Sequence, residues 1–288
     1  MNARDWFLKA KKENFAIGAF NVDNLEIFHA ICKAGQKKKS PVMLEFSQGE
    51  ADYFGLQNIA DLVENAKDQY KIPILLNLDH SKSVEDCVKA IEVAAFDDVH
   101  FDGSDLTFEE NIEKTKEVVA AAHKKDLLVE GEFDKVSGSS EVHTADVDLE
   151  QLKNSYTNPV KAAEFVAKTG VDILASVFGN IHGTFPVQPD LDIDLLKTIL
   201  DILPETFLSM HGGSGIAADQ VKEAIKVGGI VKVNVNTELR QAFKDALGEE
   251  MGEKPTEYAY YKLTPDIVTA VMDVVEAKID VFGSGDKA

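Results

Sequence analysis

The chain has 288 residues, of which 44% are hydrophobic and 28% are charged, as is typical of a globular protein with a sizeable core. Its formal net charge of −20 argues against nucleic acids and anionic membrane surfaces as partners. The sequence has neither an apolar signal-type region near its beginning nor the roughly 18 consecutive apolar residues of a membrane helix, so we expect a cytoplasmic protein without a membrane partner.

Short β-rich segments recur along the chain, and each is followed by an amphipathic helical pattern. The predicted strands are residues 15–21, 41–47, 73–79, 98–103, 127–133, 173–179, 206–212 and 230–237. Alternating strands and helices produce parallel strands, and eight such units in this length predict an α/β fold, a single-domain (β/α)8 TIM barrel over residues 1–288. A doubly wound sheet is the alternative, but such a sheet usually stops at about five or six strands.

The connection after the fifth predicted strand is unusually long. It runs from Asp134 to Asn158, where the next helix begins with Pro159 in its first turn. Connections of more than about 12–15 residues inside a compact domain are usually functional or disordered. Gly138 lies between two serines, so we expect a long mobile loop here and consider it a candidate lid.

Most predicted strands end in, or lead into, polar residues that a packed core does not need. Active sites of barrels lie at the C-terminal ends of the strands, so these side chains are expected to share one rim. Asp79 and His80 have no evident structural task, because Ser83 and Asp86 already form a capping box for the next helix. The strand-end residues are Asn21, Ser47, Asp79, His80, Asp102, Glu132, His182, His211, Asn234 and Asn236.

Three of the seven histidines, His80, His182 and His211, lie at these strand ends. Three imidazoles with an open fourth position are the ligand set of a catalytic zinc ion. A single strand-end histidine is more often structural, and these three come from distant segments, so the pattern alone leaves both interpretations open. The other histidines lie in predicted helices, inside a strand or in the long loop, and are assigned no function: His29, His100, His123 and His143.

The motif HGGSG at residues 211–215, which precedes a helix, predicts an anion-binding turn. Glycines let backbone N–H groups approach a ligand closely, and a helix N-terminus adds its positive end. A simple tight turn would need only one glycine. The motif NVNT at residues 234–237 ends the next strand, and this pair of strand ends is the usual phosphate site of barrel enzymes. We expect this last strand to alternate, with Lys232, Asn234 and Asn236 facing inward and Val231, Val233 and Val235 facing the helices.

Together these motifs resemble the class II, zinc-dependent ketose-bisphosphate aldolases, of which fructose-bisphosphate aldolase is the best known. The resemblance implies a glycolytic carbon–carbon lyase that cleaves fructose 1,6-bisphosphate to dihydroxyacetone phosphate and glyceraldehyde 3-phosphate. Zinc would stabilise the ene-diolate as a Lewis acid. Sugar phosphates are then the expected partners, and a homodimer or homotetramer the expected assembly. The segments that carry the resemblance, in family order, are FAIGAFNVDNLE, SPVMLEFSQG, LLNLDH, VEGEF, GVDILASVFGNIHG, MHGGSG and VKVNVNTE.

The resemblance also implies a role for each strand-end residue. Zinc would be held by His80, His182 and His211, and Asp79 would be the acid/base that serves the aldehyde oxygen. Asn234 would help to hold the ene-diolate. Two further acidic residues match positions that in some members support or bind a second, displaced divalent metal: Asp102 and Glu132. The residues expected to contact the substrate are Asn21, Ser47, Gly183, Gly212, Ser214, Asn234, Asn236 and Thr237.

The sequence departs from the family pattern in three places. After the fifth strand it lacks the usual glycine pair and acidic run, which leaves Glu141 as the nearest candidate for the loop acid/base. The segment TFPVQP replaces a lysine that often follows the second histidine in the family. The sequence therefore does not decide whether the protein has a monovalent-cation site. The segment EYAYYKLTP replaces an arginine that many relatives use for the distal phosphate, and Lys262 is its only candidate here.

Three alternatives to fructose-bisphosphate cleavage remain. Tagatose bisphosphate is an alternative substrate, although Asn236 is more typical of fructose-bisphosphate enzymes. A Schiff-base aldolase would use an inward-facing strand lysine, which Lys232 provides, but it would leave three histidines without a role. A sugar-phosphate-binding protein without catalysis would keep the metal and the phosphate turn, and the unusual loop motivates this interpretation.

Overall fold

The computed structural model describes residues 1–93 and 95–288, and within them eight parallel strands close into a barrel. These strands are β1 (Ile17–Asn21), β2 (Val42–Ser47), β3 (Ile74–Ser81), β4 (Asp98–Asp102), β5 (Leu128–Glu132), β7 (Ile173–Ala175), β9 (Phe207–Met210) and β10 (Ile230–Val235). Their spatial order is β1-β10-β9-β7-β5-β4-β3-β2, so neighbours in sequence are neighbours in space. The predicted (β/α)8 barrel is confirmed.

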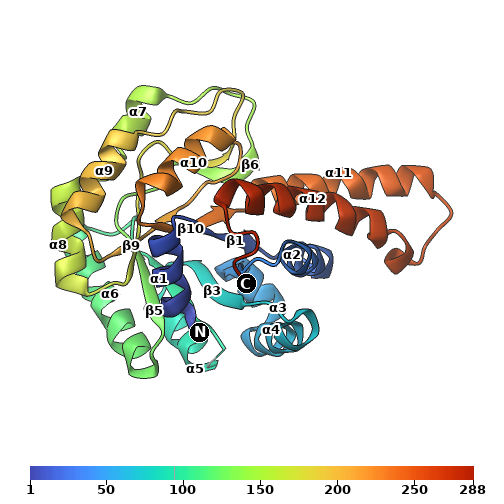
Figure 1. The fold of residues 1–288 in the computed structure, drawn as a ribbon, viewed down its shortest axis with the longest axis horizontal. Coiled ribbons are helices and arrows are strands. Elements are labelled where there is room, and N and C mark those ends of the chain that lie inside the picture. The colour runs from blue at the N-terminus through green and yellow to red at the C-terminus, as the bar shows by residue number, and fades with distance from the viewer. Residues whose placement is uncertain (94) are drawn as a thin grey trace.

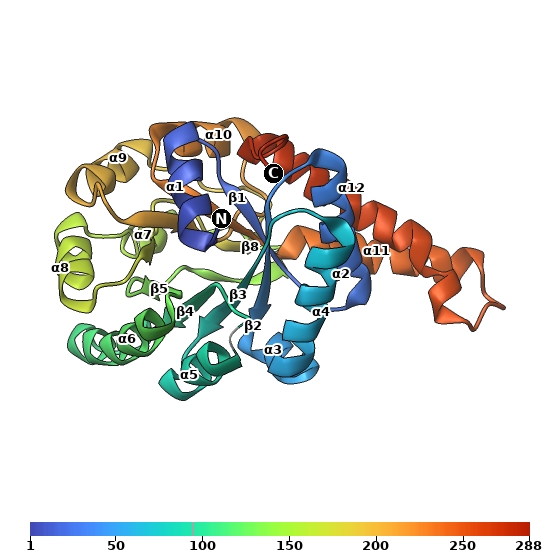
Figure 2. The same ribbon diagram turned by 60° about the horizontal axis from the view of Figure 1, so that its bottom comes forward.

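A ring of helices surrounds these strands, as Figures 1 and 2 show from two directions. Asn158 caps the helix that has Pro159 at its start, and Thr107 and Glu110 form a capping box. No described helix is long and apolar enough to cross a membrane. The helices of the ring are α2 (Leu25–Lys38), α3 (Gln48–Phe54), α4 (Leu56–Tyr70), α5 (Val84–Val93), α6 (Phe108–Ala122), α8 (Pro159–Thr169), α9 (Ile193–Ile202), α10 (Ala218–Val227), α11 (Thr237–Glu253) and α12 (Thr264–Phe282).

An additional helix, α1 (Ala3–Glu13), precedes the first strand and packs at the N-terminal end of the barrel. Its Trp6 and Phe7 join one buried cluster with the first inward-facing residues of several strands, among them Leu128 and Phe207. The rings of Phe7 and Phe207 meet edge to face, 5.6 Å between centroids. This end of the barrel is therefore apolar and filled, and the opposite end is left for polar chemistry.

A layer of buried charges lies inside the barrel. The Nζ of Lys232 is fully buried and lies 2.6 Å from Oε2 of Glu130 and 2.8 Å from Oε1 of Glu45. Burial opposes a charge on Glu130, but Lys232 holds the pKa of this carboxyl well below its usual value. Burial raises the pKa of Asp98, 3.8 Å from the same lysine, well above its usual value. The layer thus centres on one ionised pair, Lys232 and Glu130.

One prediction about the last strand is wrong. Val233 and Val235 pack between barrel and helices as expected, but Val231 joins the inner apolar cluster beside Trp6. The pairing of β10 with β9 shifts between Ile230 and Lys232, and this irregularity breaks the alternation of the strand at Val231.

The long connection after β5 contains two elements that the sequence pattern did not predict, β6 (Gly138–Val142) and α7 (Leu149–Lys153). Strand β6 pairs in parallel with β8 (His182–Thr184), outside the barrel. The predicted sixth strand is shorter than expected, because β7 ends at Ala175 and the chain then runs irregularly to His182. The backbone N–H of His182 donates to the carbonyl oxygen of Ser137 at 2.8 Å, so the loop is tied to the segment that carries this histidine.

Helices α11 and α12 extend away from the barrel as an antiparallel pair, here called the arm (Figure 1). Lys262 lies in the turn Tyr260–Lys262 near the tip of the arm and pairs with Glu257 at 2.9 Å. It does not line the cavity at the barrel mouth of its own chain.

Removing the buried lysine should destabilise the barrel. Lys232→Met keeps a side chain of similar length but leaves Glu130 ionised and buried without its cation. We expect the free energy of unfolding, measured by urea denaturation, to fall by about 3–5 kcal/mol. Lys244→Met, on the exposed side of α11, is the matched control and should change it by less than about 0.5 kcal/mol. Equal effects of the two variants would contradict a structural role for the buried pair.

Candidate metal centre

A cavity of about 310 Å³ opens at the C-terminal ends of the barrel strands, at the small end of the range typical of small-molecule sites. Most of the residues singled out from the sequence line it, and the exceptions include Glu141, Lys262, Lys232 and the motif glycines Gly213 and Gly215. These lining residues are Asn21, Ser47, Asp79, His80, Asp102, Glu132, His182, Gly183, His211, Gly212, Ser214, Asn234, Asn236 and Thr237.

Four imidazoles of the described chain meet at or beneath this cavity, where three were expected. The ring centroid of His80 lies 5.0 Å from that of His182 and 4.6 Å from that of His211, and 5.9 Å separates the last two. The fourth ring, His100 of β4, lies 4.6 Å from His80 and 4.9 Å from His211. Strand ends that are distant in sequence therefore bring four imidazole rings near one another, and ligand atoms of three of them, His80, His100 and His211, lie within 4.8 Å of one another.

Glu130 sets the tautomer of His211. Nε2 of His211 donates to Oε1 of Glu130 at 2.7 Å, and the hydroxyl of Ser209 donates to the same oxygen. With the proton on Nε2, Nδ1 keeps its lone pair, and this buried atom has no hydrogen-bond partner among the described residues. Burial lowers the pKa of His211, so the ring is neutral. A neutral imidazole with a free, buried nitrogen is the form that binds a metal.

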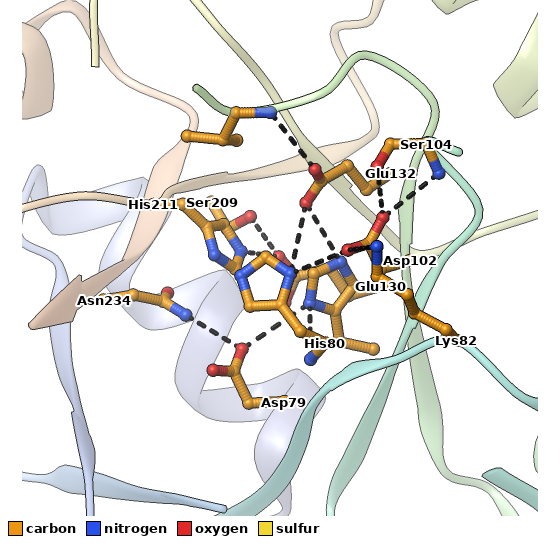
Figure 3. A network of polar contacts seen from close by, with 12 residues as sticks. Asp79, His80, Lys82, Asp102, Ser104, Glu130, Glu132, Ser209, His211 and Asn234 are labelled. Carbon is orange, nitrogen blue, oxygen red and sulfur yellow. Dashed lines mark hydrogen bonds and ion pairs between the residues drawn. The ribbon is translucent and has the colours of Figure 1, made fainter. Parts of the chain in front are cut away.

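Two carboxylates, those of Asp102 and Glu132, lie close to the imidazole of His80 (Figure 3). Its Nδ1 lies 3.2 Å from Oδ2 of Asp102 and 3.6 Å from Oε2 of Glu132. Burial opposes a charge on Asp102, but His80 and the hydroxyl of Ser104, 2.6 Å away, hold the pKa of this carboxyl far below its usual value. Oε2 of Glu132 is buried and lacks a hydrogen-bond partner in the part of the chain that the structure describes.

Asp79 lies next to His80 and faces the same cavity. Its carboxylate accepts hydrogen bonds from Nδ2 of Asn21 at 3.2 Å and from Nδ2 of Asn234 at 3.3 Å. Burial disfavours its charge, but the neighbouring His80 and the ring of His100, whose Nδ1 lies 3.6 Å from Oδ1 of Asp79, hold its pKa well below the usual value. Asp79 is therefore an ionised carboxylate in a fixed orientation.

These donors fit a divalent cation. Ligand atoms of Asp79, His80, His100 and His211 all lie within 4.8 Å of one another, as do those of His80, Asp102 and Glu132. An unpaired buried polar atom costs about 1–3 kcal/mol, and two such atoms among the described residues, Oε2 of Glu132 and Nδ1 of His211, lie at this cluster. Imidazole nitrogens with carboxylate oxygens suit zinc or another transition metal better than magnesium or calcium.

The whole sequence matches one family as well. The class-II fructose-bisphosphate aldolase family is matched over residues 1–287. The chain belongs to this family. It is an aldolase, a lyase that makes and breaks carbon–carbon bonds, and its family is generally metal-dependent.

Similar proteins agree on this chemistry. The aldolase is 38% identical over 296 residues to a fructose-bisphosphate aldolase of Streptococcus pneumoniae serotype 4, which covers 98% of this chain and 97% of the relative. It is 36% identical over 279 residues to the sulfofructosephosphate aldolase of Alkalicoccus urumqiensis, with 97% and 95% covered. The crystal structure of the YdjI aldolase of Escherichia coli K12 has a TM-score of 0.83 to it, at 31% identity, with 100% of both chains covered. The names of these relatives differ in the sugar phosphate.

The glycine-rich turn of the aldolase lies beside the N-terminus of α11. At Gly212, with φ +65°, a Cβ atom would overlap the carbonyl oxygen of Ile181, so only glycine fits. The hydroxyl oxygen of Ser214 accepts from the backbone N–H of Glu238 at 3.4 Å and keeps its own hydrogen free to donate. Thr237 opens α11 and lines the cavity. Hydroxyl groups and a helix N-terminus thus face the same space, as an anion requires.

Glu141, the loop acid/base expected from the sequence, does not line the cavity. On β6, Gly138 and Ser140 line the cavity, and the alternation of the strand turns Glu141 away from it. Its side chain is exposed.

Lys232 is unsuited to a Schiff base. Burial opposes its charge, but Glu130 and Glu45 raise its pKa well above the usual value, and it does not line the cavity. A Schiff-base lysine must present a neutral amine to the substrate. The structure therefore does not support Schiff-base catalysis by Lys232.

Two groups of functional residues were missed by sequence reasoning. His100 lies two residues from Asp98 and from Asp102 on β4, and Glu130 lies two residues from Glu132 on β5. Residues two apart in a strand face the same side, so following every second residue inward from the strand end would have found both. The cavity wall also holds cations that no motif signals. They are Lys82 and Lys135, which both pair with Asp105, and Arg240, which pairs with Asp23 and Glu50.

Removing a metal ligand should abolish metal binding without unfolding the barrel. His182→Ala and His211→Ala are each expected to lower bound metal far below one equivalent, measured by plasma mass spectrometry, with unchanged far-UV circular dichroism. His123→Ala, near the opposite end of the barrel, is the control and should keep metal and activity. A chelator should stop wild-type turnover, whereas borohydride with substrate should not. Full metal content in both ligand variants would place the site elsewhere.

Losing a hydroxyl at the phosphate turn should weaken phosphate binding selectively. Ser214→Ala and Thr237→Val each remove one donor to a charged group, so we expect about 1–3 kcal/mol weaker binding of dihydroxyacetone phosphate by calorimetry. Dihydroxyacetone, which lacks the phosphate, should bind equally poorly to wild type and variants. If both ligands weaken alike, these hydroxyls do not contact the phosphate.

Proposed function

We propose that this aldolase cleaves fructose 1,6-bisphosphate to dihydroxyacetone phosphate and glyceraldehyde 3-phosphate and catalyses the reverse condensation, with zinc as its cation. The observation that carries the proposal is that the imidazole–carboxylate cluster, Asp79 and the phosphate turn line a single cavity. The name of the Streptococcus pneumoniae relative supports this substrate.

His80, His182 and His211 would hold the catalytic zinc. Burial, reinforced by the neighbouring imidazoles, lowers the pKa of His182 well below its usual value, so it is neutral like His211. When bound, zinc would supply Lewis-acid stabilisation of the negative charge that develops beside the ketone during cleavage. The close grouping of His80, Asp102 and Glu132 supports these residues as a second position for a divalent or monovalent cation.

Asp79 would move the hydroxyl proton of the reaction. In cleavage, its carboxylate takes the proton from the C4 hydroxyl as the C3–C4 bond breaks and the aldehyde carbonyl forms. In condensation it returns that proton to the aldehyde oxygen. Asn21 and Asn234 hold the carboxylate for this transfer, and Asn234 also contacts the carbon skeleton in our assignment.

A second group must move the proton on C3 of dihydroxyacetone phosphate. The sequence proposes Glu141, which lies outside the cavity in this conformation, so the role requires β6 to turn it inward. The carboxylates already in the cavity, Asp102 and Glu132, are the alternatives.

The distal end of the substrate has no assigned anion ligand. The sulfofructosephosphate aldolase relative makes a sulfonate-bearing ketose phosphate the second candidate substrate, and tagatose 1,6-bisphosphate is the third. Lys82 and Lys135 are the lysines that face the cavity among the described residues. Coupled assays of the purified enzyme with all three substrates measure which one it prefers. A higher kcat/KM for either alternative would overturn the fructose assignment.

Self-association is part of the proposal. The tip of the arm exposes large apolar side chains, Met251, Tyr258 and Tyr261, which supports the expected homodimer or homotetramer. Sedimentation equilibrium measures it, and a monomer at micromolar concentration would contradict it.

Dividing the two proton transfers between two carboxylates gives a paired test. Asp79→Ala should retain zinc and solvent hydrogen exchange into dihydroxyacetone phosphate but lose about 10²-fold or more in cleavage. Glu141→Ala should retain zinc and lose exchange, measured by nuclear magnetic resonance in deuterated water. If Asp79→Ala loses zinc and exchange together, Asp79 only supports His80. Undiminished exchange in Glu141→Ala would assign the second base to the cavity carboxylates.

A further inference from the structure

Asp79 and His80 are consecutive residues of one strand, yet both side chains face the cavity. In a regular strand, neighbouring side chains point to opposite sides, so one of the two would face the helices. The register of β3 against β4 breaks here, with Leu78 opposite Val99 and Ser81 opposite Phe101. Two residues of β3 therefore stand opposite a single residue of β4, His100, which is the geometry of a β-bulge.

The bulge gives His80 a backbone conformation that residues other than glycine rarely adopt. Its φ is +48°, in the left-handed region that favours glycine. Its backbone N–H is directed away from the strand ladder and donates to Nδ1 of His100 at 3.2 Å. The ring opposite the bulge thus takes the place of the missing backbone acceptor.

The other ring nitrogen of His100 faces Glu132. Nε2 lies 3.4 Å from Oε2 of Glu132, and neither atom has a hydrogen-bond partner among the described residues. A ring that accepts at Nδ1 carries its proton at Nε2, so this nitrogen presents a donor to the carboxylate. His100 is fully buried and does not line the cavity, so it does not touch a substrate there.

We propose that His100 is a positioning residue, which holds the bulge so that His80 presents its imidazole to the metal beside Asp79, and which orients Glu132 through Nε2. The assignment rests on the proposed metal site at His80, His182 and His211.

Three substitutions separate the two ring nitrogens. His100→Asn keeps an acceptor where Nδ1 lies, His100→Gln keeps a polar group where Nε2 lies, and His100→Leu removes both at similar volume. We expect zinc affinity, measured by competition with a chromophoric chelator, to fall about 10–100-fold in the Leu and Gln variants. The Asn variant should stay within about 3-fold of wild type. The visible spectrum of the cobalt-loaded protein should change in the first two variants and be retained in the third.

Two further measurements distinguish a failure of the role proposed for His100 from a failure of the proposed aldolase function. Wild-type zinc binding and fructose-bisphosphate cleavage, assayed in parallel, test the function itself. Amide hydrogen exchange of the peptide that contains His80, measured without metal, tests the bulge directly and should quicken in His100→Leu but not in His100→Asn. Unchanged zinc affinity in a folded Leu variant overturns the proposal. So does rescue by Gln rather than Asn, because His100 would then act through Nε2 alone.

Discussion

Glu130 joins the barrel core to the candidate metal centre. One of its oxygens accepts from Lys232 at 2.6 Å, and the other accepts from Ser209 and from Nε2 of His211. The lysine keeps Glu130 ionised, and Glu130 keeps the proton of His211 on Nε2, which leaves Nδ1 free to bind a cation. A buried ion pair contributes little net stability, because desolvation offsets its attraction. Here the ion pair fixes the tautomer of His211. The candidate metal site depends on this tautomer more than on the stability that the ion pair contributes.

The bulge at Asp79 and His80 solves a second geometric problem of the site. In the proposed mechanism, the carboxylate of Asp79 and the metal ligand His80 act on one substrate, but a regular strand would turn one of the two side chains outward. The extra residue of the bulge brings both to the same face. Because the left-handed backbone of His80 is strained, its neighbours must hold it in place, and the nearest group that does so is the ring of His100.

The sequence predicted the barrel well because hydrophobic β-rich runs and helix caps are local signals. It also predicted the strand-end residues of the cavity wall, since parallel strands bring their C-terminal ends to one rim, but it missed the loop residues and the cations Lys82, Lys135 and Arg240. The failures have a common cause. The inward position of Val231 and the outward direction of Glu141 both depend on register or on pairing with another strand. Such pairings are long-range, and no single segment of sequence encodes them.

The pairing of β6 with β8 links the loop after β5 to the segment that carries His182. Gly138 and Gly183 let the two backbones approach so closely that a Cβ atom at Gly138 would overlap the carbonyl oxygen of His182. The loop also bonds to this segment on both sides, from His182 to Ser137 and from His143 to Thr184, at 2.8 Å each. A turn of β6 that carries Glu141 inward must therefore break these bonds or move β8 with it. Since His182 lies on β8, the position of the loop would be energetically coupled to the geometry of the proposed metal site.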